Sequence, residues 1–202
     1  MAYSDFKSLL EVERTLGVKN RRTEIFSAVT PLDASDSLLQ RLQLARELPV
    51  RSEKAKSEMI VVPILMELRG RNEKFFTIYS GENLNVDEQK GLKGECDFII
   101  AKDTGSFEIT SPLLQMVEAK KNDVDIGIPQ CAAQMIGAKL FNEANGTQLP
   151  VIYGCVTTGD DWLFMKLEKD LQIDTRKYYL GNVAELLGAF QIIIDYYKAE
   201  LP

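Results

Sequence analysis

The apolar residues of this chain change their spacing near residue 70, and this change limits the possible folds more than any other feature. Before it, apolar residues recur at helical spacing over residues 4–16 and 35–48. A third helix is predicted over about 52–69, with a kink at Pro63. After it, short β-branched and apolar runs bounded by turn residues predict strands. Helices followed by strands, a helix, more strands and a last helix predict a mixed α/β domain.

The second part of the chain supplies most of the predicted sheet. Strands are predicted at Phe75–Tyr79, Cys96–Ile100, Leu113–Lys120, Val151–Thr157 and Trp162–Leu167, with another at Leu171–Ile173 or Lys177–Leu180. Helices are predicted from about Pro129 to Ala144 and from Asn182 to about Lys198. Since no repeat or linker divides the chain, we expect a single domain over 1–202. It would comprise an N-terminal helical extension (1–50), a core (51–180) and a C-terminal helix (181–202).

The composition excludes several classes of enzyme. The sequence contains no histidine, which removes hydrolases, proteases and nucleases that need a histidine base, and metal sites with histidine ligands. Metal chemistry would then rest on carboxylates, which favour Mg²⁺ or Mn²⁺. The 24 basic and 30 acidic residues give a net charge of -6, which disfavours nonspecific binding to nucleic acid.

The sequence also bears on location. No apolar run is long enough to span a bilayer, and the first residues lack the cationic and apolar stretches of a signal peptide. The three cysteines, Cys96, Cys131 and Cys155, are odd in number and widely spaced. This pattern favours reduced thiols over a disulfide framework. We therefore expect a cytoplasmic protein with no membrane contact.

Three charged residues on predicted strands are the best candidates for chemistry. Glu118 and Lys120 are two residues apart, so both side chains leave the same face of their strand. Asp97 lies in an apolar run on the preceding strand. If the strands are neighbours, two carboxylates and a lysine converge, and such carboxylates can bind a cation that polarises a phosphodiester. The lysine can stabilise charge that develops on the phosphate.

A plainer interpretation of the same residues also exists. Residues 118–123 read Glu-Ala-Lys-Lys-Asn-Asp, which is also typical of a solvated strand end that runs into a charged turn. The acid-x-Lys spacing alone recurs at Asp5–Lys7 and Glu88–Lys90. Only the triplet at Glu118 ends an apolar strand and has a strand-borne aspartate upstream.

The order of elements and these residues together resemble the PD-(D/E)xK, or restriction-endonuclease-like, nuclease superfamily. Three segments carry the likeness: the entry helix from Ser52 to Leu65, Gly94-Glu95-Cys96-Asp97-Phe98, and Val117-Glu118-Ala119-Lys120-Lys121. The later Tyr153–Gly159 stretch is also similar, so the resemblance covers about residues 52–180. It implies a mixed central sheet flanked by helices, here with extra N-terminal helices.

The resemblance also implies roles for individual residues. Asp97 and Glu118 would be metal ligands and Lys120 the catalytic lysine. The helix-borne carboxylate that completes the metal site would be Glu58, one turn before an apolar stretch, or else Glu53, which we expect to be more exposed. Gln130 or Gln134, one helical turn apart, would supply the glutamine of the crossover helix, although a polar stripe on a half-buried helix explains them equally well.

Two functions follow from these observations. The first is a Mg²⁺- or Mn²⁺-dependent nuclease that hydrolyses phosphodiester bonds, with nucleic acid, most simply DNA, as its partner. The second is a catalytically silent domain of the same fold that binds a partner or forms a homodimer through its leucine-rich front helices. The acidic composition favours the second, and the retained Asp, Glu and Lys set favours the first.

Overall fold

The computed structural model describes residues 1–201 and contains one seven-stranded sheet in the order β1-β7-β6-β5-β4-β3-β2. The strands are β1 (Asn20–Thr23), β2 (Phe76–Asn83), β3 (Glu95–Lys102), β4 (Leu113–Ala119), β5 (Ile152–Thr157), β6 (Asp161–Leu167) and β7 (Leu171–Tyr179). Neighbours are antiparallel except β4 with β5 and β1 with β7, which are parallel. The predicted α/β class with a mixed sheet is confirmed.

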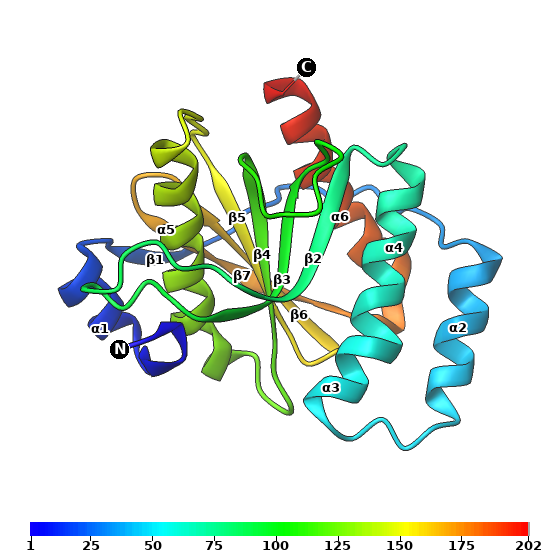
Figure 1. Ribbon diagram of the computed structural model, residues 1–202. Coiled ribbons are helices and arrows are strands. Elements are labelled where there is room, and N and C mark those ends of the chain that lie inside the picture. The colour runs from blue at the N-terminus through cyan, green and yellow to red at the C-terminus, as the bar shows by residue number, and fades with distance from the viewer. Residues whose placement is uncertain (202) are drawn as a thin grey trace.

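Helices cover both faces of this sheet. They are α1 (Leu9–Leu16), α2 (Asp36–Arg46), α3 (Glu53–Lys56), α4 (Val62–Arg71), α5 (Ile128–Ala144) and α6 (Val183–Glu200), with the π-helix η2 (Ser57–Val61) and the 3₁₀ helices η1 (Tyr3–Asp5), η3 (Asp125–Gly127) and η4 (Leu180–Asn182). α5 lies on one face with α1 against it, and α4, α2 and α6 lie on the other (Figure 1). No helix within residues 1–201 has the length and apolarity needed to cross a bilayer.

The β4–α5–β5 unit positions the candidate site. Two parallel strands need a crossover connection, and α5 provides it by packing along β4 and β5. The approach is close because β5 carries Gly154 under the helix. A Cβ at Gly154 would lie 2.3 Å from Met135 Sδ. α5 is therefore held directly over β4, with Gln130 and Gln134 near its first turns.

The N-terminal 50 residues differ from the predicted helical extension. Residues 20–23 form β1, an edge strand that pairs with β7 and adds to the central sheet. Its Asn-Arg-Arg-Thr sequence has no apolar alternation, so pairing with β7 decides its conformation. The predicted helix over 4–16 is also divided into η1 and α1, since Ser8 caps a new helix start by accepting from the Glu11 N–H at 3.2 Å.

The third predicted helix contains an irregularity just before Pro63. α3, η2 and α4 follow one another without a break, and the π-helical turn covers Ser57–Val61. Proline lacks an N–H and its ring disturbs the preceding turn of an α-helix. A π turn, with its i to i+5 spacing, is one way in which a helix accommodates such a disturbance.

Candidate active site

The start of β3 lies beside the end of β4 because the two strands are antiparallel neighbours, and the candidate site lies at this end of the two strands. Their last ladder pair at this end is Phe98 with Val117. Beyond it, the Ala119 N–H donates to Asp97 Oδ2 over 2.7 Å. A side-chain carboxylate thus takes the place of a backbone carbonyl, and Asp97 is fixed between the two strands, close to Glu118.

Glu118 is only 1% exposed, and both of its carboxylate oxygens have partners. Lys120 Nζ donates to Oε1, and Gln134 Nε2 donates to Oε2 over 2.8 Å. Lys120 Nζ also donates to Gln130 Oε1 over 3.1 Å. The sequence left open which glutamine reaches the site, and the structure places both against the acid and lysine pair.

Burial governs the electrostatics of this cluster. Burial, reinforced by the nearby Asp97, raises the pKa of Glu118 to about 7, although Lys120 and Gln134 act in the opposite direction. Burial likewise raises the pKa of Asp97, against the Ala119 N–H and Lys120. Burial alone would lower the pKa of Lys120, but Glu118 outweighs it and the pKa is raised. Lys120 therefore keeps its positive charge while Glu118 titrates near neutral pH.

A glycine that sequence reasoning did not single out lets α5 begin beside the lysine. A Cβ at Gly127 would lie 2.5 Å from Val156 Cγ1 and 3.0 Å from Lys120 Cγ. A larger residue would push the start of the helix, and with it Gln130, away from the strand end. A glycine before a helix has many explanations, so the sequence alone carried no signal for this one.

The expectation about the helix-borne carboxylate was wrong in one respect. Glu58 is exposed, whereas Glu53 is partly buried, the reverse of the predicted order. Glu53 also acts electrostatically on both Asp97 and Lys120, raising the pKa of each. The cause is the π turn η2, through which the three-and-four spacing of an α-helix does not hold. Glu58 instead lies 3.8 Å from Lys54, in an ion pair on the surface.

An open cleft of about 390 Å³ lies in front of Asp97. Residues of α3, η2, β2 and β3 line it: Glu53, Lys54, Ser57, Glu58, Ser80, Gly81, Glu95, Asp97 and Phe98. Glu95 is a further carboxylate that sequence reasoning missed. The sequence does indicate it, because residues two apart on a strand share a face and Glu95 precedes Asp97 by two.

The carboxylates at the start of β3 and the end of β4 suit a hard divalent cation, since carboxylate oxygens are the ligands that Mg²⁺ and Mn²⁺ prefer. Asp97 Oδ1 has no hydrogen-bond partner within residues 1–201, and Gln134 Oε1 is buried without one. Glu118, however, already uses both oxygens. Within the same residues, no three His, Cys, Asp or Glu side chains form a group with the geometry of a metal site. A cation on Glu118 would require Lys120 or Gln134 to give way.

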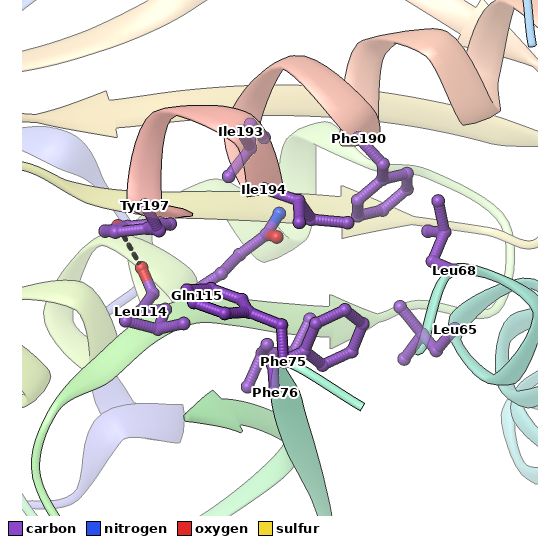
Figure 2. A pocket seen from close by; sticks show the side chains of 11 residues that line it. Leu65, Leu68, Phe75, Phe76, Leu114, Gln115, Phe190, Ile193, Ile194 and Tyr197 are labelled. Carbon is purple, nitrogen blue, oxygen red and sulfur yellow. Dashed lines mark hydrogen bonds between the residues drawn. The ribbon is translucent and has the colours of Figure 1, made fainter. Parts of the chain in front are cut away.

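A separate apolar cavity lies on the opposite face of the sheet, between α4, α6 and strands β2 to β4 (Figure 2). Figure 2 shows the Gln115 side chain reaching in among apolar residues, and its Nε2 is buried without a partner among residues 1–201. The main lining residues are Leu65, Leu68, Phe75, Phe76, Phe190 and Ile194. Its volume of about 10 Å³ is room for about one water molecule. The open cleft, and not this cavity, can therefore admit a substrate.

No family model matches this chain, and neither does any curated protein. The functional conclusion rests on the site itself.

Proposed function

We propose that this protein has a restriction-endonuclease-like fold and hydrolyses phosphodiester bonds in DNA with a divalent cation, Mg²⁺ or Mn²⁺. The observation that carries the proposal is the cluster at the start of β3 and the end of β4, where Asp97 and Glu118 lie with Lys120 and two glutamines. The order of α3 with Glu53, β3 with Asp97, β4 with Glu118 and the crossover helix α5 with its two glutamines agrees with the order of elements that the resemblance implies.

Asp97 and Glu118 are the residues that would hold the cation, and Glu53 is the helix-borne carboxylate that acts electrostatically on Asp97 and Lys120. When bound, the cation polarises the phosphodiester and lowers the pKa of a water molecule. Lys120 remains protonated and is held by Gln130. Its ammonium group can then stabilise the negative charge that develops on the phosphate.

The test is cleavage of a mixed panel of single-stranded, duplex and branched DNA, with Mg²⁺ or with a chelator. Lys120→Ala should lower the rate by about a hundredfold or more, the usual effect of losing a group that stabilises transition-state charge. Lys121→Ala removes the same charge from an exposed neighbour and should cleave like wild type. Equal rates for the two variants, or cleavage that the chelator leaves unchanged, would contradict the proposal.

The two helix carboxylates provide a second, matched comparison. Glu53→Gln should weaken Mg²⁺-dependent cleavage, because this partly buried acid acts on Asp97 and Lys120. Glu58→Gln changes an exposed acid that lines the same cleft but is not among the groups that shift the pKa of Asp97 or Lys120, so it should have the smaller effect. Loss of activity in Glu58→Gln alone would return the role to Glu58.

The alternative of a catalytically silent partner-binding protein has one specific observation in its favour. α2 and the loop that follows it expose three leucines, Leu39, Leu44 and Leu48, each about half accessible. If the panel shows no cleavage, concentration-dependent dimerisation that Leu44→Glu abolishes would support this alternative.

A further inference from the structure

A second open groove lies beside the candidate active site, on the other side of α3. It has a volume of about 270 Å³ and lies between α2, the α3–η2 segment and η4. Figure 1 shows α2 at the margin of the fold, joined to α3 by a loop. The groove is lined by Leu42, Ala45, Arg46, Leu48, Val50, Lys56, Ile60, Asp160, Leu180 and Gly181.

The α3–η2 segment separates this groove from the cleft in front of Asp97 and lines both. Its residues Glu53 and Ser57 line the cleft in front of Asp97, whereas Lys56 and Ile60 line the groove. Lys56 Nζ donates to the Lys121 carbonyl over 2.9 Å, and Lys121 directly follows the candidate catalytic lysine. The groove is thus tied to the loop that carries the site.

The walls of the groove combine two kinds of surface. Leu42, Ile60 and Leu180 form an apolar floor and are each at most 9% exposed, and Leu48 is 51% exposed at the margin. Arg46 lies in the last turn of α2 and makes no ion pair within residues 1–201, whereas Lys56 and Asp160, which also line the groove, pair with each other over 3.6 Å. Its guanidinium group is available for an anion, and guanidinium groups bind phosphate in a bidentate manner.

We propose that this groove holds one unpaired nucleotide of the substrate strand, with its base against the apolar walls and its phosphate on Arg46. The substrate is then a single strand, or a duplex whose end has opened. This inference rests on the proposed nuclease function and names its substrate class. Apolar side chains commonly enclose bases that have left the stack.

An intact duplex fits the groove less well. Its outer surface presents phosphates and sugars, while the base faces that would cover Leu48 and Leu180 stay stacked inside. The protein also carries a net charge of -6, so general attraction to a polyanion contributes little to its binding. Local contacts with an unpaired nucleotide have to supply the affinity.

The charge in the groove is tested by fluorescence anisotropy with a short labelled single strand and with the same sequence as a blunt duplex. A Lys120→Ala background keeps both probes intact. Arg46→Gln should weaken binding of the single strand by about tenfold, the usual effect of losing a charged hydrogen bond. It should also lower the salt dependence by about one ion. Arg41→Gln, on the same helix but outside the groove, should change the affinity by less than about twofold.

The shape of the groove is tested without changing any charge. A Cβ at Gly181 meets nothing within 4 Å, and the same holds for Gly70, an exposed position on α4 away from the groove. Gly181→Leu should therefore fold normally, and because Gly181 lines the groove, the added side chain should take up space there and weaken binding of the single strand. Gly70→Leu should bind like the parent. Thermal melts establish that both variants are folded.

The outcomes separate this inference from the proposed function. Tighter binding of the single strand, reduced by both Arg46→Gln and Gly181→Leu, supports the groove. Equal binding by these variants and their controls, preference for the duplex, or no binding to either probe overturns it. Cleavage is read independently, in variants with Lys120 intact. A nuclease that cleaves normally with Arg46→Gln keeps the proposed function and loses the nucleotide groove.

Discussion

The substitution Glu118→Gln should make the protein less sensitive to pH. Glu118 is buried at the end of β4, and burial raises its pKa from 4.5 to about 7. Glutamine keeps the shape of the side chain and cannot ionise. Its amide can still accept from Lys120, and it can donate to Gln134 Oε1, which has no partner in the described part of the chain although it is buried. The variant should therefore fold.

The size and sign of the effect follow from the pKa of Glu118. An acid whose pKa is raised on folding favours the folded state while it is protonated. This contribution is complete below pH 4.5 and is lost as the pH rises through about 7. Because each pKa unit corresponds to about 1.4 kcal/mol, the loss amounts to about 3 kcal/mol. Asp97, whose pKa is also raised, contributes in the same direction to both proteins and largely cancels in their difference.

Urea unfolding at a series of pH values, with a chelator present, measures this difference. From about pH 4 to about pH 8, the stability of Glu118→Gln relative to wild type should increase by about 3 kcal/mol. Glu58→Gln changes an exposed carboxylate and should follow the wild-type curve. If Glu118→Gln also runs parallel to wild type over the whole range, Glu118 does not titrate in the way that its burial implies.

Three further outcomes are expected. Mg²⁺ should raise the melting temperature of wild type but not of Asp97→Asn, because a cation that binds only the folded protein stabilises it; equal shifts in thermal melts would refute a site at Asp97. Gly137→Ala should cost about 1–3 kcal/mol, since its Cβ would lie 2.3 Å from Tyr3 Oη. Adding Tyr3→Phe should restore part of this loss in a double-mutant cycle measured by urea unfolding. Asn142→Leu should lower the free energy of unfolding by about 3 kcal/mol in the same assay, because the Asn142 side chain forms hydrogen bonds with both the N–H (2.7 Å) and the C=O (2.8 Å) of the buried Leu113. A loss below about 1 kcal/mol would show that water replaces the amide.

The sequence alone was sufficient for the elements that carry the site. Glu118 and Lys120 share a face because side chains alternate along a strand, and Gln130 and Gln134 share one because they are a helical turn apart. Both relations depend only on local backbone geometry. They hold in the structure, where Lys120 contacts Glu118 and Gln130, and Gln134 contacts Glu118.

The predicted strands and helices also lie close to their observed positions wherever the apolar pattern was strong. The predicted helix from about Pro129 to Ala144 corresponds to α5, and both predicted alternatives near residues 171–180 fall largely within one strand, β7. Such segments bury their apolar residues on a regular face, so their conformation can be predicted from the order of residues.

Only the tertiary structure decided the features that depend on partners distant in the chain. β1 has no apolar alternation and becomes a strand because β7 offers it a ladder. Glu53 rather than Glu58 raises the pKa of Asp97, because the π turn η2 interrupts the regular spacing of the α-helix. Tertiary packing also raises the pKa of Glu118 and forms the cleft and the groove on either side of α3. The burial of a side chain and the shape of a cleft depend on many residues that are distant in the sequence. The periodicity of apolar residues reflects only residues within a turn or two of the chain.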